Sequence, residues 1–299
     1  MCYFSSMKQR IPAFLKPGDL IGLSATARFA TQEMIDTATE FIEKAGFRVH
    51  FEDDILFREG QVAGSIAQRI QSFNKLIDHK GIKAIWNVRG GYGSADIVDA
   101  VDWSSLKKHP KWLVGFSDFT TFLLHAHQHD IPTVHAAMPI SFENTTNDHL
   151  NDTFRVLSHG PQPLELKEDH GHCRGTLIGG NLSVIFSIYG TPSLPSLKNA
   201  ILLLEDLDEY HYHLDRMLLS LKRQGAFKGL RGVLLGQFSD IHDHDIPWGT
   251  EVEKTLRKYF DELSIPVLTN LPFGHTSQQF PLVIGSSAEV NKNQIEFKL

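Results

Sequence analysis

The sequence predicts an α/β protein with two domains: an N-terminal parallel-sheet domain built from βαβ units, and a C-terminal domain of mixed α+β type. Two observations support this prediction. Short apolar runs alternate with amphipathic stretches through the first half of the chain, which is typical of βαβ units. The length of 299 residues also exceeds the usual size of one domain, so we expect two domains that share a cleft.

The first half contains four segments that we predict to be strands, each followed by a helix, and all but the second are apolar runs expected to be buried. The predicted strands are residues 19–25, 47–51, 84–88 and 112–116. The predicted helices carry apolar residues at one-face spacing over 34–42, 66–77, 97–101 and 119–127. Parallel strands of this kind bind ligands at their carboxyl ends, so the loops that follow them are the first places to look for a site.

The alternation loosens after about residue 142, where the second domain is expected to begin. A helix near 147–158 leads into a stretch rich in proline and charge, which we predict to be a linker over residues 161–172. The predicted domains are therefore 1–160 and 173–299. In the second domain we predict a helix over 214–221 and strands over 199–204, 266–269, 281–284 and 294–297.

Composition excludes several classes of function. A formal net charge of −6 and a pI near 6.2 argue against nucleic acid as a partner, because binding a phosphate backbone needs a basic face. No apolar run is long enough to span a bilayer, and no signal peptide stands at the N-terminus, so no membrane partner is expected. Only Cys2 and Cys173 are present, which fits a reducing, cytoplasmic setting without a structural disulfide.

Ser117 stands where a predicted strand gives way to a helix, in Gly115-Phe116-Ser117-Asp118. A sharp turn there exposes the hydroxyl, and the next backbone N–H groups lie at a helix N-terminus, where negative charge is favoured. One such donor contributes about 3 kcal/mol to binding a tetrahedral oxyanion. The alternative is an ordinary N-cap, which is the commoner role of Ser or Asp before a helix. Phe119 also occupies the position of the last glycine in a G-x-S-x-G elbow.

A glycine-rich loop, residues 89–93, follows another predicted strand. Its glycines allow backbone to approach a ligand closely, so an N–H of Gly91 or Tyr92 is a candidate second oxyanion donor. A plain tight turn is the alternative. A dinucleotide site is not indicated, because the spacing is not G-x-G-x-x-G.

The second half offers carboxylates and histidines. Glu205 and Asp206 end a leucine-rich strand, where a carboxylate could fix a histidine tautomer. His275 lies in a short loop after Gly274, although composition does not single it out among 16 histidines. The pairs His211/His213 and His242/His244 suggest a metal, but i and i+2 side chains on a strand face opposite sides, and no H-E-x-x-H or C-x-x-C accompanies them. No metal and no other cofactor is expected.

Six segments carry a resemblance to a known family when they are read in order along nearly the whole chain. They are residues 15–22, 89–93, 115–118, 179–183, 204–206 together with 215–218, and 274–275. In this order they resemble the LD-carboxypeptidases of the S66 serine peptidases, a family that includes muramoyltetrapeptide carboxypeptidase and the microcin C immunity hydrolases. Phe119 is then no departure, because the family pattern is G-x-S-D.

The resemblance implies a Ser-Glu-His triad that falls on Ser117, Glu205 and His275. Ser117 would be the nucleophile, His275 the general base and then acid, and Glu205 the group that orients the imidazole. The N–H of Asp118 and one N–H of the glycine loop would hold the oxyanion. The site would then lie at the interface between the two domains.

The resemblance also implies a substrate and an assembly. The expected reaction is hydrolysis of the L,D amide bond that releases terminal D-alanine from murein tetrapeptides in peptidoglycan recycling. This reaction needs a cationic group to receive the free terminal carboxylate, and Arg89 is a candidate, with a turn-stabilising arginine as the alternative. A homodimer is expected, because homodimers are usual in the family.

Some residues depart from the family pattern and leave the preferred peptide open. His211 stands in place of a proline, His213 in place of an arginine, and Ala136 in place of the glycine that usually follows His135. One alternative is a microcin C immunity-type hydrolase of peptidyl or aminoacyl nucleotides. Another is an α/β ligand-binding protein without activity.

Overall fold

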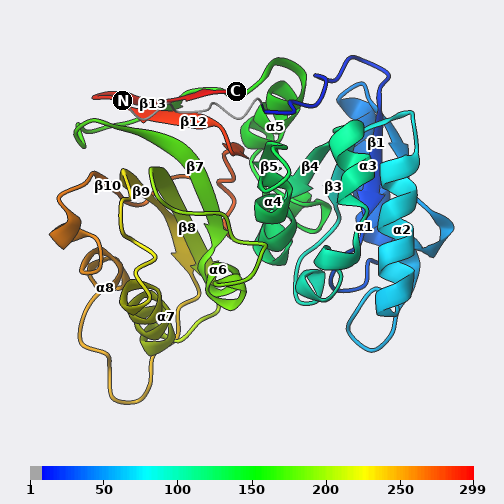
Figure 1. Ribbon diagram of the computed structural model, residues 1–299. Coiled ribbons are helices and arrows are strands. Elements are labelled where there is room, and N and C mark those ends of the chain that lie inside the picture. The colour runs from blue at the N-terminus through cyan, green and yellow to red at the C-terminus, as the bar shows by residue number, and fades with distance from the viewer. Residues whose placement is uncertain (1–8) are drawn as a thin grey trace.

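The computed structural model describes residues 9–299, and the chain forms two β-sheets, each covered by helices (Figure 1). The sheet built mainly from the first half lies on the right in Figure 1, and the sheet of the second half lies on the left. The predicted α/β class with a parallel N-terminal sheet is confirmed. Of the two cysteines, Cys173 is buried, and Cys2 lies outside the described residues.

The first sheet has six strands in the order β11-β5-β4-β3-β1-β2. Its parallel strands are β1 (Leu20–Ser24), β2 (Arg48–His50), β3 (Ile82–Asn87), β4 (Trp112–Gly115) and β5 (Thr133–His135). Helices α1 (Gln32–Lys44) and α5 (Asn147–His159) pack on one face. Helices α2 (Ile66–Asp78), α3 (Trp103–Lys108) and α4 (Thr120–His127) pack on the other. Alternate residues of β3 supply both cores, since Trp86 faces one helix layer and Ile85 the other.

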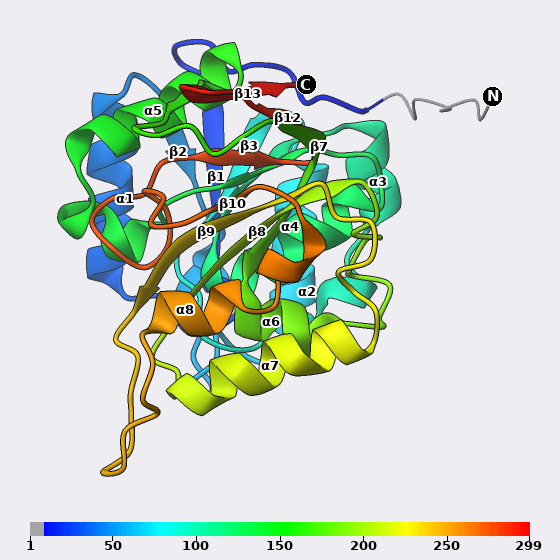
Figure 2. The ribbon, with the colours of Figure 1, turned by 90° about the vertical axis from the view of Figure 1, so that its left-hand side faces the viewer.

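The second sheet has seven strands in the order β10-β9-β8-β7-β12-β13-β6. Its parallel half is β7 (Cys173–Asn181), β8 (Ala200–Leu207), β9 (Gly232–Ser239) and β10 (Val267–Leu268). Its antiparallel half is β12 (Ser287–Val290), β13 (Gln294–Lys298) and β6 (Leu164–Glu165). Helices α6 (Leu182–Ile188), α7 (His211–Arg223) and α8 (Val252–Arg257) lie along one side of this sheet (Figure 2).

One local prediction is wrong, and one strand was not predicted. The helix expected over 97–101 is replaced by two 3-10 turns, Ser94–Asp96 and Val98–Ala100. The next helix, α3, starts later because the Asp102 carboxylate accepts the N–H of Ser105 and caps it there. Strand β7 could not be recognised from the sequence, because its three glycines have low β-propensity. Gly179 is required there, since a Cβ would come within 1.9 Å of the Leu203 carbonyl oxygen.

Several contacts tie the two halves of the chain together, and two of them position the site. Strand β11 (Leu282–Ile284) returns from the second half and pairs antiparallel with β5 at the edge of the first sheet. Thr120, at the start of α4, accepts the backbone N–H of Asn181 through its hydroxyl at 3.2 Å. A Cβ on Gly180 would meet that hydroxyl at 2.6 Å, so glycine is needed for this close approach. The carboxyl ends of β4 and β7 are therefore held against each other.

Among residues 9–299, no helix is both long and apolar enough to cross a lipid bilayer.

Candidate active site

Ser117 occupies a strained turn between β4 and α4. Its φ of +58° lies in the left-handed region, which non-glycine residues rarely adopt and which is a feature of nucleophile elbows. Ser117 is only partly buried, although its neighbours Phe116 and Asp118 are both buried. The N-cap alternative is wrong: Ser117 begins a 3-10 turn, α4 starts at Thr120, and neither element has a side-chain cap. The backbone strain exposes the hydroxyl and contributes nothing to capping.

The glycine loop packs directly against this turn. A Cβ on Gly90 would come within 2.9 Å of both Cβ and Oγ of Ser117, so only glycine fits there. The buried carboxylate of Asp118 accepts the backbone N–H of Ser94 at 2.9 Å and so fastens the end of the loop to the turn. Burial raises the pKa of Asp118, although the Ser94 hydrogen bond opposes this.

The backbone N–H groups expected to hold an oxyanion are available. Those of Asp118, Gly91 and Tyr92 donate to no group within residues 9–299. The side chain of Tyr92 is 71% exposed and is not fixed by packing. The loop therefore offers backbone donors rather than side chains.

Glu205 and His275 form a pair on the second sheet. Nδ1 of His275 lies 2.7 Å from Oε2 of Glu205, which is fully buried near the end of β8. Gly274 makes this contact possible, because a Cβ there would meet the Gln237 carbonyl oxygen at 2.9 Å and Cβ of Glu205 at 3.2 Å. Its φ of +121° also suits glycine.

The electrostatics of this pair are coupled. Burial alone would raise the pKa of Glu205, but the charge of His275, together with the neighbouring His135 and the His275 hydrogen bond, outweighs burial and holds that pKa at about 2. For His275, burial alone would lower the pKa, and the charge and hydrogen bond of Glu205 instead raise it. Each group therefore stabilises the charged form of the other.

The ring of Phe116 joins the two parts of the site. Its centroid lies 4.5 Å from that of His275, and Phe116 is the residue immediately before Ser117. The structure therefore brings the segment of the predicted nucleophile, from the first sheet, to the predicted base on the second.

His135 lies on the other side of Glu205, and sequence reasoning gave it no role. It is fully buried at the end of β5, and its Nε2 lies 3.9 Å from Oε1 of Glu205. That separation is too long for a hydrogen bond, so His135 lies beside Glu205 without donating to it. Neither ring nitrogen of His135, nor Oε1 of Glu205, has a partner within the described part of the chain.

Asp206 separates from Glu205 because successive strand residues face opposite sides. Its carboxylate accepts from Nδ2 of Asn181 at 2.8 Å and from the backbone N–H of Ser183 at 2.9 Å. Burial, followed by the charge of Glu205, raises the pKa of Asp206 to about 7. Asp206 therefore anchors the start of α6 to β8 and points away from His275.

Arg89 is half-buried beside Phe29. Its Nη1 lies 3.4 Å from the Phe29 carbonyl oxygen, and no carboxylate of residues 9–299 lies within 4.0 Å of its guanidinium. Burial, and next the charge of Arg28, lowers the pKa of Arg89. The guanidinium is thus placed at the glycine loop without a charge partner.

The histidines that suggested a metal are dispersed among different partners. His211 bonds to Thr255 at 2.8 Å, His213 to Glu209 at 2.9 Å, and His242 to Asp208 at 2.6 Å. No cluster of three or more His, Cys, Asp or Glu residues suited to a metal occurs in the described chain.

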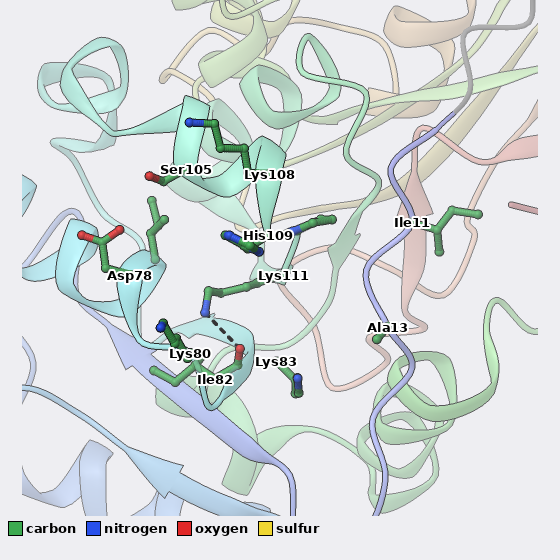
Figure 3. Close-up of a pocket in the computed structure, with 12 residues that line it drawn as sticks. Ile11, Ala13, Asp78, Lys80, Ile82, Lys83, Ser105, Lys108, His109 and Lys111 are labelled. Atoms are coloured by element: carbon green, nitrogen blue, oxygen red, sulfur yellow. Dashed lines mark hydrogen bonds between the residues drawn. The ribbon is translucent and has the colours of Figure 1, made fainter.

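A cavity of about 870 Å³ lies elsewhere (Figure 3). It opens beside the amino ends of β3 and β4, at the opposite edge of the first sheet from Ser117 and the glycine loop. Four of its twelve lining residues are lysines, and one of them, Lys111, donates to the Ile82 carbonyl oxygen at 3.0 Å. None of the predicted site residues lines this cavity, so we give it no part in the proposed chemistry.

A serine on a strained strand-to-helix turn, free backbone donors beside it, and a buried carboxylate–histidine pair are features of a serine-type peptidase. Two family models match the chain, the LD-carboxypeptidase N-terminal domain over residues 21–136 and the LD-carboxypeptidase C-terminal domain over residues 174–290. The chain belongs to the LD-carboxypeptidase family of S66 peptidases.

Curated relatives agree with this membership over almost their full length. The chain is 29% identical over 292 residues to a probable murein peptide carboxypeptidase of Bacillus subtilis, covering 94% of this chain and 91% of that protein. It is 27% identical over 292 residues to the murein tetrapeptide carboxypeptidase of Pseudomonas aeruginosa, with 93% and 94% covered. A putative carboxypeptidase of Synechocystis is 31% identical over 290 residues, with 94% of each covered.

Solved structures share the fold. The muramoyltetrapeptide carboxypeptidase from Oxalobacter formigenes superposes with a TM-score of 0.85 at 26% identity, covering 94% of this chain and 99% of that one. MccF in complex with glutamyl sulfamoyl guanosine superposes with a TM-score of 0.88 at 21% identity, covering 96% and 98%. The two scores are nearly equal, so the fold alone does not distinguish these two kinds of enzyme.

Proposed function

We propose that this protein releases terminal D-alanine from murein tetrapeptides by hydrolysing the L,D amide bond, with Ser117, His275 and Glu205 as its catalytic triad. The observation that carries the proposal is the buried Glu205–His275 pair, 2.7 Å apart, brought to the segment of Ser117 by the contact of Phe116 with His275. The curated relatives named for murein peptides give the substrate class.

The geometry defines the role of each group. Because Nδ1 of His275 faces a carboxylate, Nδ1 carries the proton and Nε2 is left to accept one. Nε2 would take the proton of Ser117 as Oγ attacks the carbonyl carbon. The resulting oxyanion would be held by the N–H of Asp118 and by that of Gly91 or Tyr92.

Collapse of this intermediate breaks the C–N bond. His275 gives its proton to the leaving nitrogen, D-alanine departs, and the tripeptide remains as an ester on Ser117. Water then attacks the ester, again with His275 as base, and restores the free serine. Glu205 stays ionised throughout, as expected for a group whose pKa is held at about 2.

The domain limits, assembly and location belong to the same proposal. We propose domains over 1–160 and 173–299 with a linker over 161–172, into which β6 (Leu164–Glu165) is built as an edge strand. A cytoplasmic homodimer is proposed from the family resemblance and from the acidic, cysteine-poor composition. Sedimentation equilibrium would report the assembly directly.

A microcin C immunity-type activity is the alternative and is not favoured. The structural likeness to MccF is as strong as that to the muramoyltetrapeptide enzyme, but at 21% identity it supports only the fold. The two activities can be separated by comparing hydrolysis of a murein tetrapeptide with that of an aminoacyl sulfamoyl adenylate. We expect kcat/KM to favour the tetrapeptide. A preference for the sulfamoyl adenylate would reject the substrate assignment and leave the triad in place.

A further inference from the structure

Two guanidinium groups stand beside the glycine loop, one from Arg28 and one from Arg89. The stem of Arg28 lies across the loop, since a Cβ on Gly91 would come within 2.3 Å of its Cδ and 2.4 Å of its Cγ. The backbone N–H of Arg28 also donates to the Gly90 carbonyl oxygen at 3.4 Å. Arg89 opens the same loop. The sequence reading singled out Arg89 but gave Arg28 no role.

This pair lies close to the proposed nucleophile. Gly90 is in contact with Ser117, and Gly91, the next residue, is in contact with Arg28. The chain of contacts from Ser117 to Arg28 therefore passes through two adjacent glycines. In the proposed substrate, only the N–Cα unit of D-alanine separates the scissile carbonyl from the terminal carboxylate. A receptor for that carboxylate must lie this close to the serine.

Neither arginine is neutralised. No Asp or Glu of residues 9–299 lies within 4.0 Å of either guanidinium, and the Nε atoms of both are buried without a hydrogen-bond partner. Two neighbouring positive charges repel each other, and the pKa of Arg89 is lowered first by burial and then by the charge of Arg28. Two adjacent guanidinium groups without a carboxylate partner suit the binding of an anion.

Arg69, on the same side of the sheet, shows what a structural arginine looks like in this fold. Its Nη1 donates to the carbonyl oxygens of Thr26 and Gly93, both at 2.7 Å, and its Nη2 lies 3.4 Å from Asp96. Arg69 holds the loops together through its Nη atoms, although its Nε, like those of Arg28 and Arg89, is buried without a partner in the described chain. Arg28 and Arg89 lack such bonds, apart from the long contact of Arg89 with Phe29.

We propose that Arg28 and Arg89 together bind the free carboxylate of the terminal D-amino acid and thereby make the enzyme a carboxypeptidase rather than an endopeptidase. Guanidinium groups bind carboxylates through paired, charge-assisted hydrogen bonds, and two of them would satisfy both oxygens. The inference rests on the proposed function, because it presumes a peptide substrate cleaved at Ser117.

The test compares two substrates that differ only at the carboxylate. Wild type, Arg28→Ala, Arg89→Ala and Arg28→Lys are assayed on L-Ala-γ-D-Glu-diaminopimelate-D-Ala and on the same peptide ending in D-alaninamide. Loss of a hydrogen-bonded charge partner reduces kcat/KM by about ten- to a hundredfold, so each alanine variant should lose this much on the acid, mainly through KM. Activity on the amide should change by less than about threefold, which shows that the variants are folded. Arg28→Lys should recover only part of the loss.

The control is Arg48→Ala, which removes an exposed arginine at the amino end of β2 whose Nε donates to the Gly18 carbonyl oxygen. It should leave both activities unchanged. If wild type releases D-alanine but the Arg28 and Arg89 variants keep its acid-to-amide preference, the carboxylate receptor is rejected and the proposed function stands. If wild type releases neither product, the proposed function fails and the inference fails with it.

Discussion

Oε2 of Glu205 accepts a hydrogen bond from Nδ1 of His275 across 2.7 Å, between residues 70 positions apart in the chain. Because Glu205 is fully buried, the pair is shielded from water, and the interaction is stronger than it would be at the surface. The first two predictions follow from this coupling.

Glu205→Gln should shift the pH dependence of catalysis. The carboxylate raises the pKa of His275, and a base works only in its neutral form, so the acid limb of the wild-type kcat/KM profile should lie above the ordinary histidine pKa of 6.5. Removing the negative charge should move that limb to lower pH and reduce kcat by about 10⁴-fold, since the glutamine also disturbs the tautomer. An unchanged limb in a pH series would exclude His275 as the titrating base.

The same pair should stabilise the fold over a defined pH range. The pKa of Glu205 is depressed from 4.5 to about 2 in the folded state, so its contribution is complete above pH 4.5 and is lost as the pH falls toward 2. The difference in unfolding free energy between wild type and Glu205→Gln should therefore shrink as the pH is lowered through this range. Urea denaturation at several pH values measures it, and a difference that grows on acidification would contradict the assignment.

His135→Phe tests whether the histidine behind Glu205 helps to position it. A shift of about 1 Å would bring Nε2 of His135, now 3.9 Å from Oε1, within hydrogen-bond distance. We expect the phenylalanine to cost about 1–3 kcal/mol of stability, because Oε1 stays buried with no donor in reach. It should also raise the pKa of His275, because Glu205 stays ionised and no longer shares its negative charge with His135. NMR titration of His275 in both proteins supplies the measurement, and equal pKa values would rule out a positioning role.

Gly90→Ala should block the nucleophile through sterics. The added Cβ would lie 2.9 Å from both Cβ and Oγ of Ser117 and 3.3 Å from the Asp118 nitrogen, so the turn has to move. We expect a fluorophosphonate to label Ser117 at least tenfold more slowly, with about 1–3 kcal/mol lost from stability. Gly46→Ala is the matched control: at a φ of +89° it strains the backbone, but no atom lies within 4 Å of the new Cβ. Equal labelling rates in the two variants would show that the Gly90 contact is not needed.

Much of the fold could be predicted because its signals are local. The strands and helices of the first sheet follow apolar runs and one-face stripes, and the loop after β3 and the turn after β4 could be placed at the sheet edge on that basis. Strand β7 was not predicted because residues such as Gly179 have low β-propensity. Glycine is required at that position only because of contact with a neighbouring strand. That neighbour is distant in the sequence.

The site was less accessible to local reasoning. Residues alone favoured a cap at Ser117, and only coordinates show the positive φ that prevents it. His275 was one of 16 histidines, and the resemblance to a family, not its surroundings in the sequence, singled it out. Arg28 carried no signal, and His135 entered only as the residue before a departure from the family pattern, because buried atoms without partners cannot be recognised from sequence.

The most direct test of the proposed function is a side-by-side assay of D-alanine release from L-Ala-γ-D-Glu-diaminopimelate-D-Ala by wild type and Ser117→Ala. The wild type should release D-alanine and the variant should be slower by at least 10⁴-fold, while both unfold at similar urea concentrations. Release at equal rates would show that Ser117 is not the nucleophile. No release by a folded wild-type protein would contradict the proposed activity itself.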